Sequence, residues 1–161
     1  MGVPFARRGK RADELLQVLA KLWTGQVVEH HGEFFDVPAL EMLPAPSEPI
    51  RVHVGGTSEA ALRRAARNDG WVSDLHTIEE LAAIRQQIER YREEYDRTHV
   101  PFSLYGSASD AWDLDGYRRV HDAGVTHLVT MPWYFYAGPE ADLAGKVDAI
   151  ERFAEDVIAK W

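Results

Sequence analysis

Cysteine is absent from the 161 residues of this chain, so the sequence excludes disulfide bonds, thiolate metal sites and a thiol nucleophile. It also lacks any run close to the roughly 18 apolar residues that a membrane-spanning helix needs. The amino terminus is rich in arginine from Arg7 onward and shows no apolar signal segment. These absences predict a cytoplasmic protein with no membrane partner.

Positive charge is scarce, because 18 Lys and Arg residues stand against 26 Asp and Glu, which gives a formal net charge of −8. Nucleic-acid binding needs clustered basic side chains, and the one dense basic run, residues 7–11, begins a predicted helix and is expected to be solvated. We therefore predict no nucleic-acid partner. A chain that is 45% hydrophobic and 27% charged can form a core, so we expect a single domain over 1–161.

Hydrophobic spacing predicts a leading helix over 12–23 and a short hairpin around His31-Gly32. After a proline-rich connector, strands and helices alternate. The expected strands are 51–55, 70–73, 102–107 and 126–131, and the expected helices are 58–67, 77–98, 113–124 and one that begins near Pro139. This rhythm is typical of right-handed βαβ units and a parallel sheet. The pattern fits either half of a (β/α)₈ TIM barrel or a small open α/β sheet.

The clearest local candidate for a site is the segment Gly55-Gly56-Thr57-Ser58, which connects a predicted strand to a helix. Such a turn leaves backbone N–H groups facing an incoming anion, and two glycines let the backbone approach it closely. The Walker lysine and the full dinucleotide fingerprint are missing, so an ordinary strand-to-helix turn stays open as the alternative. Ser73 and Asp74 follow the next strand and would lie on the same rim of a parallel barrel, where active sites collect.

Other chemistry-bearing residues give weaker signals. His30 and His31 are flanked by glutamates, a donor set that suits zinc or iron, but neighbours on a strand point to opposite faces and do not easily share one ion. We predict no metal site. His53 and His127 lie inside predicted strands, where we expect hydrogen-bonded structural histidines. The aromatic run 133–136 either stacks on a flat ring or covers the core.

The ordered set of motifs resembles the middle and last strand of luciferase-like monooxygenases. The motifs are Gly2-Val3-Pro4-Phe5, Arg8-Gly9-Lys10-Arg11-Ala12-Asp13-Glu14, Leu22-Trp23-Thr24-Gly25, His31-Gly32, Pro44-Ala45-Pro46, Val54-Gly55-Gly56, Asp69-Gly70-Trp71 and Gly124-Val125-Thr126-His127-Leu128-Val129. Each motif is degenerate by itself. Their order and spacing together carry the resemblance over almost the whole chain.

The resemblance implies a (β/α)₈ barrel whose strands five to eight are formed by this chain. It further implies an oxidoreductase that binds reduced FMN or an F420-type deazaflavin coenzyme at the carboxyl ends of the strands, for hydride transfer or flavin-based oxygenation. The cofactor-phosphate contacts implied by the family fall on Gly55, Gly56, Thr57, Ser58, Val72 and Ser73. No acid or base residue is assigned.

Members of that family also carry an amino-terminal half with strands one to four, which this sequence does not show. We therefore expect an incomplete active site and either a homo-oligomer or a partner that supplies the other half-barrel. The interface is expected to be strongly apolar, formed by whichever strand residues point inward among Val52, Val54, Leu104, Leu128 and Val129. The alternatives are a non-catalytic phosphate-binding or assembly module and, in third place, a His/Glu metal protein.

Overall fold

The computed structural model describes residues 4–161, so Gly2 and Val3 of the first resemblance motif lie outside the described residues. The chain divides into two compact units, with the boundary in the sequence between Val52 and His53. The prediction of one domain over 1–161 stays a prediction, and each unit is described by itself below.

The first unit consists of helix α1 (Arg8–Leu22) and an antiparallel hairpin of β1 (Val28–His31) and β2 (Asp36–Leu40). The predicted leading helix is confirmed, although it begins four residues earlier than expected. The Glu14 carboxylate on α1 accepts hydrogen bonds from the backbone N–H of Phe34 at 3.0 Å and of Phe35 at 2.8 Å. A carboxylate that is only 13% exposed thus holds the loop of the hairpin against the helix.

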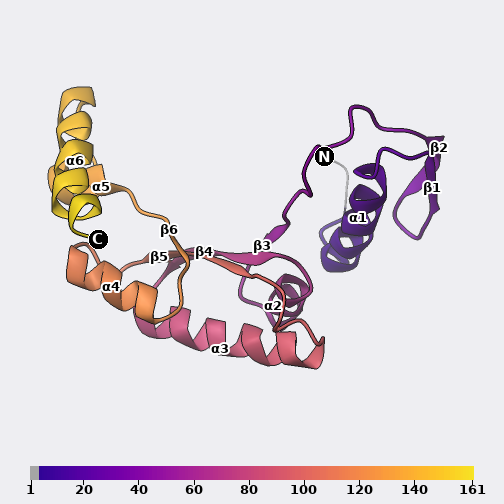
Figure 1. The fold of residues 1–161 in the computed structure, drawn as a ribbon, viewed down its shortest axis with the longest axis horizontal. Helices are drawn as coiled ribbons and strands as arrows, with labels where there is room; N and C mark the ends of the chain where they lie inside the picture. Colours follow the sequence, from indigo (N-terminus) through magenta and orange to yellow (C-terminus); the bar gives the residue numbers. More distant parts are fainter. Residues whose placement is uncertain (1–3) are drawn as a thin grey trace. The chain divides into compact units, whose positions relative to one another are not determined.

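The second unit contains the predicted four βα repeats. Its elements are β3 (His53–Gly55), α2 (Glu59–Ala66), β4 (Gly70–His76), α3 (Ile78–Glu94), β5 (Ser103–Ala108), α4 (Leu114–Asp122), β6 (His127–Leu128), α5 (Pro132–Ala137), α6 (Leu143–Asp156) and the short 3₁₀ helix η1 (Ile158–Lys160). The strands form one parallel sheet in the order β3-β4-β5-β6. Figure 1 shows α2, α3 and α4 together on one side of this sheet. The α/β half-barrel predicted from the sequence is confirmed.

Three of the helix starts follow from side chains that cap them. The Ser58, Thr77 and Asp113 side chains accept hydrogen bonds from backbone N–H groups in the first turns of α2, α3 and α4. At α3 the Glu80 side chain also accepts from the Thr77 N–H, which completes the capping box that the sequence predicted. These caps fix where each helix leaves the carboxyl edge of the sheet.

The carboxyl-terminal region differs from the prediction. The last long helix, α6, begins at Leu143 rather than near Pro139, and the aromatic run expected as a loop forms α5. Pro132 suits the first turn of α5 because a helix start does not use that N–H group. Asp142 caps α6 by accepting a hydrogen bond from the Gly145 N–H at 2.9 Å. A capping carboxylate therefore outweighed a favourable proline as the start signal.

The core lies between the sheet and its helices. Trp71, Leu104 and Ala108 from the strands are buried together with Leu62, Leu81, Ile88, Tyr117 and Val120 from the helices. Because side chains alternate along a strand, the intervening residues point to the opposite side, which we call the open face. It carries His53, Val72, Ser103, Tyr105, Ser107 and His127.

This arrangement corrects the expected apolar inner wall. Val54 packs against the helix-side core and Leu104 is buried within it, so neither lies on the open face. Leu128 alternates with His127 and likewise faces the helices, where it lines a pocket. Histidine, tyrosine and serine take the inward positions, and the open face is consequently a mixed polar and aromatic surface.

Candidate cofactor site

The candidate site is built around residues 55–58, which we call the cradle. β3 ends at Gly55 and Ser58 caps α2, with the Ser58 hydroxyl accepting from the Ala61 N–H at 3.3 Å. The Leu62 N–H donates to the Ser58 carbonyl at 3.0 Å, which closes the first turn of the helix. The N–H groups of Glu59 and Ala60 precede these bonds and point out of the helix start, where an anion can accept from them.

A buried tryptophan fixes the conformation of the cradle. The Trp71 side chain is 0% exposed, and its indole N–H donates to the Gly56 carbonyl oxygen at 2.9 Å. Gly56 has φ +99°, a region that side-chain-bearing residues rarely adopt, and an added Cβ would lie 3.3 Å from the Ala61 Cβ. The backbone of the cradle is therefore held in one shape by the core beneath it.

The electrostatics of the cradle depend on Glu59, the first residue of α2. Its carboxylate accepts from the Arg63 Nε at 2.9 Å, one turn further along the helix. The Arg63 guanidinium also donates to Glu94 at 2.5 Å, and these two carboxylates raise the pKa of Arg63 above its ordinary value. The negative charge of Glu59 is thus paired with Arg63, which reduces its repulsion of an anion at the helix start.

The second predicted part of the site lies on the neighbouring strand. Val72 of β4 is paired in register with Gly55 of β3 and is 38% exposed. The pairing of β4 with β5 shifts register between Val72 and Leu75, a bulge that redirects Ser73 and Asp74 at the carboxyl half of the strand. The structure therefore brings Val72 and Ser73 next to the cradle, while cofactor binding by these residues stays a prediction.

Sequence reasoning missed a row of aromatic rings on the open face. The Tyr105 ring lies edge-on to the His53 ring, with centroids 4.9 Å apart, and stacks on the His127 ring at 4.3 Å and 17°. Tyr105 is paired in register with Val72 on one side and with His127 on the other. The Tyr105 and His127 rings therefore lie level with Val72, one of the predicted cofactor residues. The available signal was the alternation of side chains along the strand over 103–108. It places Tyr105 on the opposite face of the sheet from the apolar Leu104.

The two histidines of this aromatic row, His53 and His127, have different surroundings. The Nδ1 atom of His127 lies 2.8 Å from the Thr126 hydroxyl, which orients the ring. The Nε2 atom of His53 is buried and has no hydrogen-bond partner among the described residues, contrary to the hydrogen-bonded histidine that we expected. A phenol and two imidazoles on one surface can donate and accept protons next to a bound ring system.

The hairpin histidines point to opposite sides, as the alternation of strand residues predicted. His30 contacts Glu14 through Nε2 at 3.2 Å, whereas His31 contacts Asp36 through Nδ1 at 2.5 Å. The hydrogen bond with Asp36 raises the pKa of His31. Within residues 4–161 no three metal-binding side chains converge on a common point.

The aromatic segment 133–136 has a divided role. The Tyr136 ring lies under the Arg152 guanidinium at 4.8 Å, and its hydroxyl donates to Asp156 at 3.4 Å, so this residue joins α5 to α6. Burial raises the pKa of the Tyr136 phenol. Tyr134 and Phe135 are 50% and 42% exposed and remain accessible for contacts outside the unit.

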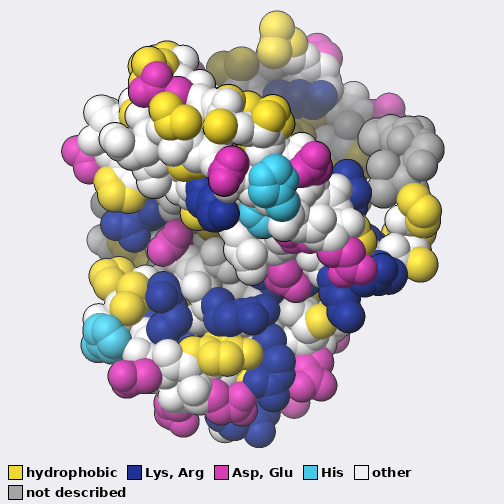
Figure 2. Space-filling model, turned by 90° about the vertical axis from the view of Figure 1, so that its right-hand side faces the viewer, with side chains coloured by type: hydrophobic (Ala, Val, Ile, Leu, Met, Phe, Trp, Pro, Cys, Tyr) yellow, Lys and Arg dark blue, Asp and Glu magenta, His cyan; other side chains and the backbone are white. Residues whose placement is uncertain are grey.

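On the face drawn in Figure 2, acidic side chains lie among the basic ones. None of the helices in the described part of the chain combines the length and the apolar character required to cross a membrane.

The four parallel strands and their helices form half of a (β/α)₈ barrel, and the candidate site lies at the carboxyl edge of these strands, where such barrels carry their sites. The family model described as luciferase-like monooxygenase matches residues 1–142. The chain belongs to this family, as the resemblance in the sequence predicted.

Individual relatives agree with this assignment. An uncharacterized protein of Mycobacterium tuberculosis is 44% identical over 164 residues, which cover 99% of this chain and 56% of that protein. An F420-dependent glucose-6-phosphate dehydrogenase of Nakamurella multipartita is 25% identical, with 96% of this chain and 46% of the relative covered. The pyrimidine monooxygenase RutA of Acinetobacter baylyi is 22% identical, with 95% and 43% covered. The chain thus spans about half the length of the relatives that it matches.

A solved structure confirms the fold. The coenzyme F420 dependent tetrahydromethanopterin reductase from Methanopyrus kandleri superimposes with a TM-score of 0.71 at 14% identity, and the match covers 94% of this chain and 63% of the reductase. At this identity the match supports the architecture alone.

Proposed function

We propose that this chain carries the cofactor-phosphate site of a flavin- or deazaflavin-dependent oxidoreductase. The phosphate of reduced FMN or of an F420-type coenzyme would bind at the cradle, with Val72 and Ser73 alongside. The observation that carries the proposal is the pair of outward N–H groups at Glu59 and Ala60, next to a glycine turn held by Trp71. Relatives named as F420-dependent dehydrogenases support the choice of cofactor class.

The residues present fit such a cofactor. All four cradle residues are exposed, and an added Cβ at Gly55 would meet only the Val72 carbonyl, at 3.6 Å, so there is space for a phosphate group close to the backbone. When bound, the cofactor supplies the hydride or the oxygen chemistry, and the protein supplies binding and orientation. Tyr105 and His127 lie at the same level of the open face and would hold protons beside the ring.

The proposal includes a second half-barrel beside the open face. This partner is either another copy of the chain or a polypeptide with the remaining strands, and a part of the substrate pocket would come from it. The edges of β3 and β6 have room for further strands, because within the described sheet each pairs on one side only.

Fluorescence titrations with FMN and with the F420-type coenzyme test the proposal. Gly56→Val places a β-branched side chain at φ +99° and beside Ala61, so we expect the dissociation constant to rise by about tenfold or more. Gly138→Val is the matched control, because Gly138 also has positive φ, +83°, but an added Cβ there meets nothing within 4 Å. Equal affinity of the Gly56→Val variant and the parent would contradict the site. Binding of inorganic phosphate without either cofactor would favour the non-catalytic module instead.

A further inference from the structure

A cavity lies on the helix side of the sheet, opposite to the open face. It has a volume of about 390 Å³ and is bounded by α4, by the residues around β6, and by the segment from Phe153 to Trp161. Tyr117, Val120 and His121 are spaced i, i+3 and i+4, so one face of α4 forms one wall. Leu128 contributes from the sheet, on the face opposite to His127.

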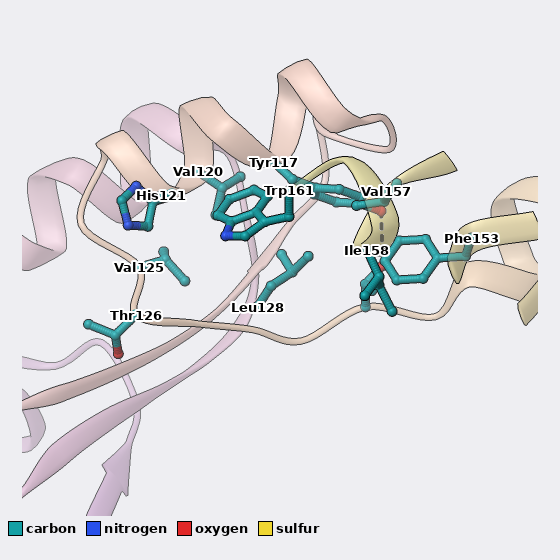
Figure 3. A pocket seen from close by; sticks show the side chains of 11 residues that line it. Tyr117, Val120, His121, Val125, Thr126, Leu128, Phe153, Val157, Ile158 and Trp161 are labelled. Carbon is teal, nitrogen blue, oxygen red and sulfur yellow. Dashed lines mark hydrogen bonds between the residues drawn. The ribbon is translucent and has the colours of Figure 1, made fainter. Parts of the chain in front are cut away.

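The lining of this cavity is apolar and uncharged. Seven of its lining residues are aliphatic or largely apolar aromatic residues, namely Val120, Val125, Leu128, Phe153, Val157, Ile158 and Trp161, and the others are Tyr117, His121, Thr126 and Thr130. Figure 3 shows Val120, Leu128 and Trp161 directed toward the middle, with His121 at one end and Phe153 at the other. Since Asp, Glu, Lys and Arg are missing from this lining, the cavity offers no partner for a charged ligand.

The most deeply buried polar group in the cavity, the Tyr117 hydroxyl, keeps hydrogen-bonding capacity. The Tyr117 hydroxyl lies 3.2 Å from the Thr130 hydroxyl, as the dashed line in Figure 3 marks. Two hydroxyls carry two protons, and their mutual bond uses one, so the pair can still donate one hydrogen bond. Tyr117 is 3% exposed and burial raises the pKa of its phenol, which keeps it protonated at neutral pH. The Thr126 hydroxyl, in contrast, is engaged with the Leu104 backbone and with His127.

We infer that this cavity binds a small, neutral, largely apolar molecule that carries one hydrogen-bond acceptor, with the acceptor at the Tyr117–Thr130 pair. An apolar cavity of about 150 Å³ accommodates benzene, so the present volume suits a bicyclic ring or a short acyl chain. The Trp161 ring, which lines the cavity, meets the His121 ring edge-on at 5.7 Å. The site is independent of the cradle, which lies at the other end of the sheet beside β3.

The test uses three probes of equal ring size: 1-naphthol, naphthalene and 1-naphthoate. By calorimetry and amide chemical-shift mapping we expect 1-naphthol to bind with a dissociation constant of about 10 µM, and naphthalene and 1-naphthoate to bind roughly tenfold more weakly or worse. Shifts should centre on the lining residues of α4 and β6. Tyr117→Phe keeps the ring but leaves the Thr130 hydroxyl as a donor, so Tyr117→Phe combined with Thr130→Val should abolish the preference for 1-naphthol over naphthalene.

A cavity-filling variant gives a second, steric test. Leu128→Trp should raise the dissociation constant for 1-naphthol by about tenfold, whereas Leu143→Trp, at a position 79% exposed and outside the lining, should leave it unchanged. If Leu128→Trp fails to fold by circular dichroism, the comparison with the Tyr117→Phe and Thr130→Val double variant decides. The inference is overturned if 1-naphthol does not bind below about 1 mM, if its shifts lie elsewhere, or if neither folded variant changes its binding.

Discussion

Trp71 connects the stability of the second unit to the shape of the candidate site. Its side chain is fully buried, and its single polar atom is bonded to Gly56 in the cradle. Trp71→Phe keeps most of the apolar contact and leaves the Gly56 carbonyl without that donor. We expect a loss of about 2 kcal/mol in the free energy of unfolding, measured by urea denaturation, together with weaker FMN binding. Trp112→Phe, at a site 55% exposed, is the control and should cost less than about 0.5 kcal/mol.

Glu14 gives the first unit a dependence on pH. Burial raises the pKa of its carboxyl, but hydrogen bonds from the Phe34 and Phe35 N–H groups and from His30 outweigh this effect, and the pKa lies below its ordinary value. A carboxylate with a lowered pKa stabilises the fold above the ordinary pKa, and that stabilisation disappears as the pH falls through the folded value.

Glu14→Gln should therefore lower the thermal midpoint at neutral pH and flatten its decline between about pH 5 and pH 3. Circular dichroism across this range measures the effect, with the exposed Glu48→Gln as the control. Parallel pH curves for the parent and Glu14→Gln would contradict the assigned role of this carboxylate.

At the scale of elements, the starts of α2, α3 and α4 are the features that the sequence predicted best. A cap is a local hydrogen bond between a side chain and a backbone N–H group of the next turn. The residues that form it lie within four positions of one another, so the sequence alone is enough to recognise it. Thr77→Ala removes the hydroxyl that accepts from the Glu80 N–H at 3.2 Å, and should cost about 1 kcal/mol in urea denaturation. Glu79→Ala, in the same turn and exposed, should cost clearly less. Equal losses would show that charge near the helix start, rather than the cap, stabilises α3.

The features that were missed depend on contacts distant in sequence. The start of α6 is the exception, because the Asp142 cap that sets it is itself a local signal, which competed with Pro139. The helix-side positions of Val54 and Leu104 could not be distinguished from positions on the open face until the buried side chains of α2 and α3 selected one face. The Tyr105 row and the α4 cavity likewise arise only when separate strands and helices meet.

At the scale of the whole molecule, we predict association through the open face and the edges of the sheet. Val129 is 47% exposed next to the edge strand β6, so a charge there should disfavour pairing with another strand. Light scattering at micromolar concentration should detect a dimer or larger species for the parent and less of it for Val129→Lys, while Glu79→Lys on α3 serves as the control. Since histidine, tyrosine and serine occupy much of the open face, we now expect a mixed rather than strongly apolar interface. A stable monomer without aggregation would contradict this prediction.

The most direct test of the cofactor site is the response of its backbone amides. In ¹H–¹⁵N spectra, FMN or the F420-type coenzyme should shift the N–H resonances of Glu59 and Ala60 downfield, because these groups are proposed to donate to the phosphate. Riboflavin, which lacks the phosphate, should leave them in place. Shifts of equal size with riboflavin, or no change at Glu59 and Ala60 when FMN or the F420-type coenzyme binds, would contradict the proposed site.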